Sequence, residues 1–339
     1  MDVCRSGVVV EPNCDYRAVH ELTRRLHFVS AVLMATILFG CAGGGASERG
    51  PVTPDNPLRI VATTSMIADL VQVVGGELVR AEGLMGPGVD PHLYQASQGD
   101  VSRMAGADVV FYNGLHLEGK MAEIFEQMHG RGQRVFAVTD AVAEDERLQS
   151  ELFTGNYDPH IWFDLSLWQK AARFVGDRLV EVDALNAEAY RSRALAFVDT
   201  LGALDEEIRA SLSRVPEEHR VLITSHDAFG YFGRAYDFDV RGLQGISTAT
   251  EAGTADVQGL AEFVAERRIP SMFIESSISP RGIEAVREAV RARGFDVHIG
   301  GTLYGDALGP AGSGADSYTG MVRANTATIV NGLAGSGEE

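Results

Sequence analysis

The chain has 339 residues, of which 45% are hydrophobic and 22% charged, as expected for one large or two medium globular domains. Its net charge of −18 argues against nucleic-acid binding, because a phosphate backbone must be met by clustered lysine and arginine. The three cysteines are Cys4, Cys14 and Cys41. The chain beyond them has no disulfide and no thiolate, so a metal site there must use His, Asp or Glu.

The first 40 residues predict a signal peptide. Arg24 and Arg25 precede an apolar run at 28–39, which is too short to span a bilayer comfortably. The run ends in Leu-Phe-Gly-Cys, which resembles a bacterial lipobox, so we expect Cys41 to carry a lipid. The alternative is a buried helix with a chance cysteine. Residues 41–56 begin with a glycine-rich stretch and predict a flexible tether.

From residue 57 onward, short β-rich apolar runs alternate with helical patterns. The runs lie at 58–63, 109–113, 134–138, 220–225, 239–243, 271–275 and 296–300, and clear helical patterns lie at 67–74, 117–128 and 254–267. This alternation predicts an α/β fold with parallel sheets covered by helices on both faces. We expect two such lobes, at 57–182 and 216–335.

Residues 183–215 predict one long linking helix. Positions 184–214 contain no proline and a single glycine, Gly202, and their apolar residues recur at helical spacing. Asp183 is a plausible N-cap, and Pro216 ends the pattern. Such a helix would be about 45 Å long, enough to run across both lobes. Two helices broken at Gly202 are the alternative.

Three of the nine histidines lie in loop-like contexts. His92 and His160 each end an Asp-Pro-His tripeptide, and His226 follows a predicted strand. Proline stiffens the backbone before each of the first two imidazoles. The Asp of each tripeptide could accept the imidazole's other N–H, as metal-binding histidines usually require. These three histidines are therefore candidate metal ligands.

A carboxylate from the second lobe could complete the set. Sites in open α/β sheets form beyond the carboxyl ends of strands. Asp306 lies in such a place, within the glycine-rich segment 301–309. Three imidazoles and one carboxylate suit a divalent ion such as Zn²⁺ or Mn²⁺. Spacing alone leaves the choice of ligands open, because the four residues are far apart in the sequence.

The motifs also resemble a known family. Both Asp-Pro-His tripeptides and the segments 112–118, 225–232 and 273–277 look like those of TroA-type metal-binding lipoproteins, the zinc/manganese solute-binding proteins of ABC importers. The resemblance extends from about residue 59 to 333. It implies two α/β lobes joined by one rigid helix, with the ion between them, and its ligand motifs match at His92, His160, His226 and Asp306.

The resemblance also limits which metal ions are candidates. Some manganese-preferring relatives carry Glu where this chain has His226, and zinc-dedicated relatives often carry a His-rich loop between the first two ligands. Here residues 119–157 contain only His129. The pattern is closest to the branch that handles both Mn²⁺ and Zn²⁺, and Fe²⁺ is a further candidate.

The resemblance also implies a function. We expect a monomeric solute-binding lipoprotein, not an enzyme, held outside the cytoplasm by its lipid, which passes the ion to an ABC permease and its ATPase. A zinc hydrolase is one alternative, although no His-Glu-x-x-His motif is present. A surface adhesin that binds metal structurally is the other.

Four acids could hydrogen-bond the ligands. Asp90, Asp158 and Asp227 lie within or beside the ligand motifs and could equally be turn residues, while Glu275 ends a predicted strand. Other residues are expected to have structural roles. We expect His116 to pack or hydrogen-bond, Asp316 to be the N-cap of the last helix, and His129, His219 and His298 to lie at the surface. Trp162, Phe163 and Trp168 are expected in the core.

Overall fold

The computed structural model describes residues 50–149 and 156–334. The predicted signal peptide, Cys41 and most of the tether lie outside these residues. All the helices and strands of the described residues lie in one compact unit, which begins at Val52. In the described ranges, no helix combines the length and the apolar character that crossing a membrane requires.

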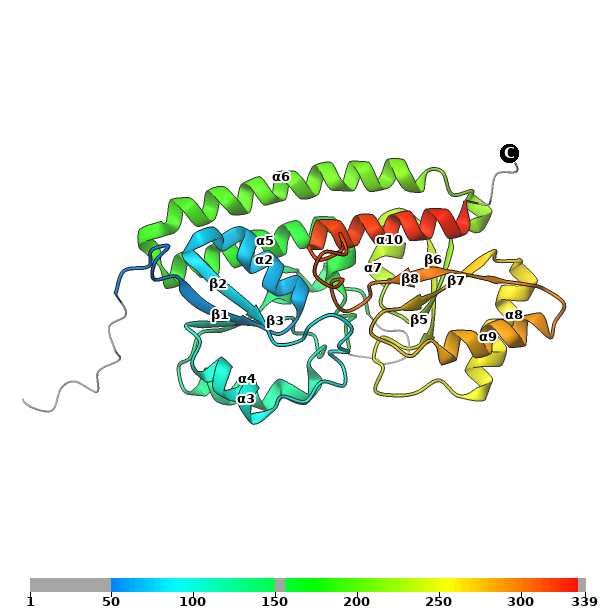
Figure 1. The fold of residues 1–339 in the computed structure, drawn as a ribbon, viewed down its shortest axis with the longest axis horizontal. Coiled ribbons are helices and arrows are strands. Elements are labelled where there is room, and N and C mark those ends of the chain that lie inside the picture. The colour runs from blue at the N-terminus through cyan, green and yellow to red at the C-terminus, as the bar shows by residue number, and fades with distance from the viewer. Residues whose placement is uncertain (1–49, 150–155, 335–339) are drawn as a thin grey trace, which may run out of the picture. The chain divides into compact units, whose positions relative to one another are not determined.

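The first lobe is built on a four-stranded parallel sheet with the strand order β2-β1-β3-β4 (Figure 1). The strands are β1 (Leu58–Ala62), β2 (Val79–Gly83), β3 (Val109–Tyr112) and β4 (Val135–Ala137). Side chains alternate between the two faces. Ile60 packs with helices α2 (Ser65–Gly75) and α5 (Leu165–Val182). Val61 packs on the opposite face with α3 (Gln98–Ala105) and α4 (Ala122–Gly130).

The second lobe contains two parallel strand pairs. One pair is β5 (Val221–His226) with β6 (Asp239–Gln244), and the other is β7 (Ser271–Glu275) with β8 (His298–Leu303). A separate apolar core forms where α8 (Thr254–Arg267) and α9 (Arg281–Arg291) cover these strands. The short helix α7 (Gly230–Tyr236) follows β5, and α10 (Tyr318–Leu333) packs on β8.

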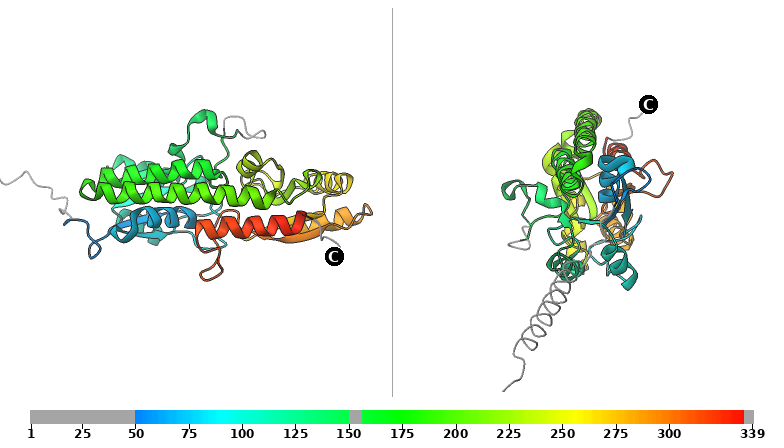
Figure 2. Two further views of the ribbon diagram at one scale, coloured as in Figure 1. Left: turned by 90° about the horizontal axis from the view of Figure 1, so that it is seen from above. Right: turned by 90° about the vertical axis from the view of Figure 1, so that its left-hand side faces the viewer.

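One long helix, α6 (Ala187–Leu212), runs alongside both lobes (Figures 1 and 2). It is unbroken at Gly202, so the alternative of two helices is wrong. It packs against α5 and α2 in the first lobe and against α10. Its buried residues, which include Tyr190, Leu201 and Leu212, are spread along its whole length. The predicted fold class, two α/β lobes with parallel sheets and a long connecting helix, is confirmed.

The two predicted helix caps fare differently. Asp183 is the N-cap of the 3₁₀ turn Ala184–Asn186 that opens the long helical segment, although its side chain accepts from Asn186 Nδ2 and the Tyr190 hydroxyl, while the N-cap of α6 itself is Asn186. The cap predicted for α10 is wrong. The N-cap of α10 is Ser317, whose side chain accepts from Gly320 N, while Asp316 accepts from Gly312 N.

Two elements of the first lobe also differ from expectation. The strand β2 did not stand out in the sequence. The helix expected from residue 117 begins only at Ala122, because Gly114, Leu115 and His116 have positive φ angles that start a separate turn.

Candidate metal centre

Four side chains from distant parts of the chain converge on one point. They are His92, His160, His226 and Asp306, and each offers one ligand atom within 4.8 Å of those of the others. All four are buried, with exposed fractions of 5%, 0%, 0% and 2%. Among the described residues, no other group of His, Cys, Asp and Glu meets in this way.

The fold explains this convergence. His92 lies in the loop between β2 and α3, and His160 precedes the short 3₁₀ turn Ile161–Phe163. His226 is the last residue of the fully buried strand β5, and Asp306 lies just beyond β8. The carboxyl ends of parallel strands form one edge of a sheet, where sites of α/β proteins commonly form. The first lobe therefore supplies two imidazoles, and the second supplies one imidazole and the carboxylate.

The ligand atoms face one another across a small space. His92 Nε2 lies 3.3 Å from His160 Nε2. Asp306 Oδ2 lies 3.4 Å from His226 Nε2 and 3.8 Å from His92 Nε2, and Asp306 Oδ1 lies 3.6 Å from His160 Nε2. Both carboxylate oxygens and all three Nε2 atoms thus face the centre. This arrangement fits a single metal ion with imidazole and carboxylate ligands.

Two of the histidines have a carboxylate against their outward nitrogen. His160 Nδ1 lies 2.7 Å from Asp158 Oδ1, which also accepts a hydrogen bond from the His160 backbone N–H. His226 Nδ1 lies 2.9 Å from Glu275 Oε2, and Glu275 Oε1 accepts from the His226 backbone N–H. Such carboxylates hold the proton on Nδ1 and leave Nε2 free to bind a metal.

Gly305 makes room for one of these pairs. A Cβ atom at this position would come within 2.2 Å of Glu275 Oε2 and 3.5 Å of His226 Cε1. The residue directly before Asp306 must therefore be glycine for the Glu275 carboxylate to reach His226.

Burial and the neighbouring charges shift the pKa values of three of the candidate ligands. Burial lowers the pKa of His92 to about 3, so its imidazole is neutral. Burial opposes the charge on His226, but Glu275 and Asp306 outweigh it and raise its pKa well above the usual value. Burial likewise opposes ionisation of Asp306, but the three histidines, His226 foremost, outweigh it and lower its pKa.

Several atoms of the site also lack hydrogen-bond partners. Both oxygens of Asp306 and Nε2 of His226, which face the centre, have none among the described residues. The same holds for His226 Nδ1 and Glu275 Oε2, whose 2.9 Å approach is an ion-pair contact. Buried polar atoms in native proteins nearly always have a partner, and a bound ion is one explanation for those that do not. A divalent cation would satisfy the three atoms that face the centre at once.

The sequence of this chain matches a known protein family. A profile of the ZnuA family, described as zinc-uptake complex component A, periplasmic, matches residues 60–332. The chain belongs to this family. The resemblance drawn from the sequence motifs is therefore confirmed.

Two ZnuA-family relatives show how similar the sequences are. The zinc-binding protein TroA of Treponema pallidum (strain Nichols) is 47% identical over 280 residues, which cover 83% of this chain and 90% of TroA. The manganese-binding lipoprotein MntA of Bacillus subtilis (strain 168) is 41% identical over 309 residues, which cover 91% of this chain and 99% of MntA.

The fold is shared with a solved structure of the ZnuA family. The structure of the periplasmic zinc-binding protein TroA from Treponema pallidum superposes with a TM-score of 0.79 at 46% identity. The superposition covers 82% of this chain and 99% of the TroA chain.

The four acids that were expected to hydrogen-bond the ligands differ in the contacts they make. Asp158 and Glu275 lie against imidazole nitrogens, as described above. Asp90 accepts the backbone N–H of His92 at 2.8 Å. Among the described residues, Asp90 makes no hydrogen bond to the His92 ring. Asp227 borders the site without a hydrogen bond to a ligand side chain in the described part of the chain, and burial next to Asp158 raises its pKa to about 6.

The other four histidines of the described residues do not belong to this group of ligands. His116 is exposed on a backbone with φ of 66°, and its side chain makes no hydrogen bond among the described residues, which does not fit the expected packing or hydrogen-bonding role. His129 and His298 are exposed as expected. His219 is half-buried, because its Nδ1 lies 3.0 Å from the carbonyl oxygen of Leu333.

Trp162 has a role at the site that sequence analysis missed. Its indole N–H donates to the carbonyl oxygen of Gly305 at 3.0 Å, and its ring lies edge-on to His160 with the centroids 5.2 Å apart. Trp162 thus connects the His160 segment to the loop that carries Asp306. Its buried position was expected, but its partner is 143 positions away and leaves no local signal.

Proposed function

We propose that this chain is a solute-binding protein that captures one divalent transition-metal ion and delivers it to an ABC importer. The observation that supports this most directly is the buried set of His92, His160, His226 and Asp306, which the two lobes contribute jointly. Their inward-facing nitrogens and oxygens are the donors that Zn²⁺ and Mn²⁺ accept. The same four residues are the ligands in this proposal, with Asp158 and Glu275 orienting two of the imidazoles.

The cargo in this proposal is Zn²⁺ or Mn²⁺. Relatives of this chain are named for each metal, TroA for zinc and MntA for manganese. By the Irving–Williams order, Zn²⁺ binds such a site more tightly than Mn²⁺ or Fe²⁺ does. Affinity alone therefore does not decide the physiological cargo, and the supply of each ion and the permease contribute to the choice.

The cellular setting follows from family membership. We propose that the protein works outside the cytoplasm with a membrane permease and its ATPase, and that it is a monomer held at the membrane by a lipid on Cys41. In this proposal residues 1–40 are removed, 41–56 form the tether, and 183–215 link the lobes at 57–182 and 216–335. The curated relative MntA of Bacillus subtilis is likewise named a lipoprotein.

The burial of the ligands distinguishes a carrier from a hydrolase. Catalytic zinc keeps an open position for water and substrate. Here the side chains of His160, His226 and Asp306 are fully enclosed, and that of His92 is 2% exposed. This enclosure suits an ion that is held and later released.

The test is metal analysis of the purified chain. We expect one equivalent of Zn²⁺ or Mn²⁺ per chain after stripping and titration. Exchanging His160 for alanine removes a ligand from a buried site, so His160→Ala should lose tight binding while keeping the fold by circular dichroism. His129→Ala, at an exposed histidine, is the matched control. Full binding by His160→Ala, or no metal on the wild-type chain, would refute the proposal.

A further inference from the structure

The two Asp-Pro-His motifs use their carboxylates differently. Asp158 contacts both the backbone N–H and the ring Nδ1 of His160. Asp90 accepts only the backbone N–H of His92, through Oδ1. Its other oxygen, Oδ2, accepts a hydrogen bond of 2.6 Å from the hydroxyl of Thr248, which belongs to the second lobe. The carboxylate that could have oriented the His92 ring is instead bonded across the two lobes.

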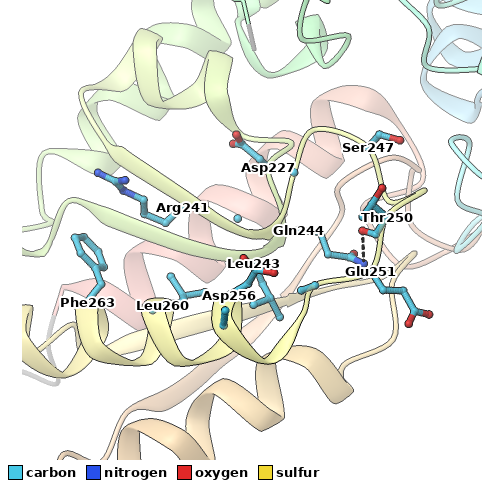
Figure 3. A pocket seen from close by; sticks show the side chains of 15 residues that line it. Asp227, Arg241, Leu243, Gln244, Ser247, Thr250, Glu251, Asp256, Leu260 and Phe263 are labelled. Atoms are coloured by element: carbon cyan, nitrogen blue, oxygen red, sulfur yellow. Dashed lines mark hydrogen bonds between the residues drawn. The ribbon is translucent and has the colours of Figure 1, made fainter. Parts of the chain in front are cut away.

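Thr248 lies in the loop 245–253, which connects β6 to α8. The loop is tied to the end of β6 by the hydrogen bond from Gln244 Nε2 to the Thr250 carbonyl oxygen, at 3.5 Å (Figure 3). Ser247, Thr250 and Glu251, which are labelled in Figure 3, line a groove on one side of the loop. This groove has a volume of about 530 Å³. Thr248 itself is buried and bonds Asp90. The loop therefore has free space beside it and a polar bond to the first lobe.

His92 is the least restrained of the four candidate ligands. His160 and His226 are each held by a carboxylate. The loop of Asp306 is held from the first lobe, where Ser65 Oγ accepts from Leu308 N at 2.9 Å. His92 is also the most exposed of the four, although only by a small margin. Its position depends on Asp90, and the position of Asp90 depends in part on Thr248.

We propose that Thr248 is a positioning residue for His92: its bond to Asp90 keeps His92 over the bound ion, and opening of the loop 245–253 releases the ion by freeing His92 first. This inference rests on the proposed function. It assigns the loop between β6 and α8 as the element that couples movement of the second lobe to one ligand of the first. Trp162, Tyr231 and Ser65 also connect the two lobes, but their bonds do not end on a residue that holds His92.

The test compares rates of metal release. Thr248→Val keeps the shape of the side chain and removes its hydroxyl. The purified chain is loaded with Zn²⁺ and mixed with an excess of a chromophoric chelator in a stopped-flow instrument. Loss of a hydrogen bond to a charged acceptor should raise the release rate by about tenfold. Thr248→Ser, which keeps the hydroxyl, should release Zn²⁺ close to the wild-type rate.

Two further variants separate this role from general loosening of the loop. Thr250→Val changes an exposed side chain in the same loop and should leave the release rate unchanged. Asp90→Ala should also speed release, and adding Thr248→Val to it should have no further effect, because the two residues act through one bond.

The outcomes distinguish this inference from the proposed function. One equivalent of Zn²⁺ on the wild-type chain, with Thr248→Val releasing it at the wild-type rate, would overturn the role of Thr248 alone. The role of Thr248 would also be overturned if Thr250→Val released Zn²⁺ as fast as Thr248→Val does, or if Thr248→Ser did not restore slow release. Full additivity of Thr248→Val and Asp90→Ala in the double variant would overturn it as well. No binding of Zn²⁺ by the wild-type chain would overturn both.

Discussion

At the residue scale, His226 and Glu275 form the most enclosed pair of the candidate centre. Both side chains are fully buried, and Glu275 approaches the imidazole Nδ1 and the backbone N–H of the same residue. A carboxylate in this position raises the basicity of the imidazole and determines which nitrogen faces the ion. In the proposed function, Glu275 would thus influence a bound ion through His226 without touching it.

The contact between Glu275 and His226 predicts how the variant Glu275→Gln should bind Zn²⁺. The amide keeps an oxygen for the His226 backbone N–H but loses the negative charge beside Nδ1. We expect Zn²⁺ affinity to fall by roughly 10- to 100-fold, measured by competition with a chelator of known affinity. Glu284→Gln, at an exposed position on α9, is the control and should bind as the wild type does. Unchanged affinity in Glu275→Gln would show that the pair is only structural.

How far the site could be predicted from sequence also depends on individual residues. His92 and His160 stand out because each follows Asp-Pro, and His226 because it ends an apolar run. Asp306 needed the family resemblance, since a glycine-rich segment gives a carboxylate no distinctive pattern. The contacts of Trp162 with Gly305 and of Thr248 with Asp90 could not be predicted, because they join residues 143 and 158 positions apart.

At the scale of elements, α2 and α10 meet through a half-buried carboxyl group. Asp69 lies on α2, and its Oδ2 accepts the backbone N–H of Tyr318, the first residue of α10, at 3.0 Å. Burial raises the pKa of Asp69; the bond from Tyr318 lowers it again in part, and nearby Asp316 adds to the rise. A carboxyl group whose pKa is raised by folding stabilises the fold only while it is protonated, and this contribution is lost as the pH rises through the folded pKa.

We therefore expect Asp69→Asn to be more stable than the wild type at pH 7. The amide oxygen still accepts from Tyr318, and no charge has to be buried. The difference should narrow as the pH falls toward 3.8, the ordinary value for this group, because Asp69 is then protonated in the wild type. Urea unfolding at pH 7 and pH 4 measures it. A variant less stable than the wild type at pH 7 would contradict the expected sign.

The elements themselves were predicted unevenly from sequence. The seven apolar runs all correspond to strands, because β-branched and aromatic residues fit the pleated surface of a strand. The strand β2, Val-Arg-Ala-Glu-Gly, lies at the edge of its sheet and carries charged residues, so it gave no such signal. The start of α4 was missed because positive φ angles at Leu115 and His116 are unusual for residues other than glycine.

At the scale of the whole molecule, the candidate centre takes its ligands from two lobes that share an apolar core. This core extends from the four-stranded sheet along α6 to second-lobe residues such as Leu222 and Phe273, and a separate core lies between α8 and α9. A ligand that binds only the folded chain stabilises it by an amount that depends on its concentration relative to its dissociation constant. Because both lobes supply ligands, an ion would stabilise their mutual arrangement as well as each loop.

Zn²⁺ should therefore raise the melting temperature of the whole unit. At a free concentration of about 100 times the dissociation constant, the stabilisation is about 2.7 kcal/mol, which corresponds to several degrees. Differential scanning calorimetry measures the shift, and Asp306→Ala provides the control. A shift of the same size in this variant would mean that Zn²⁺ acts elsewhere on the chain.

The spacing of the four candidate ligands has a consequence for folding. An ion held by His92 and Asp306 acts as a reversible cross-link that closes a loop over most of the folded chain. Like a disulfide across a long loop, such a cross-link would strongly restrict the conformations of the unfolded chain if the ion stayed bound to it. The isolated ligand segments have no shared geometry before both lobes have folded, so a nascent chain would offer the ion only scattered, weak sites. Capture of the ion therefore follows folding, and each new ion binds a chain whose two lobes have already assembled.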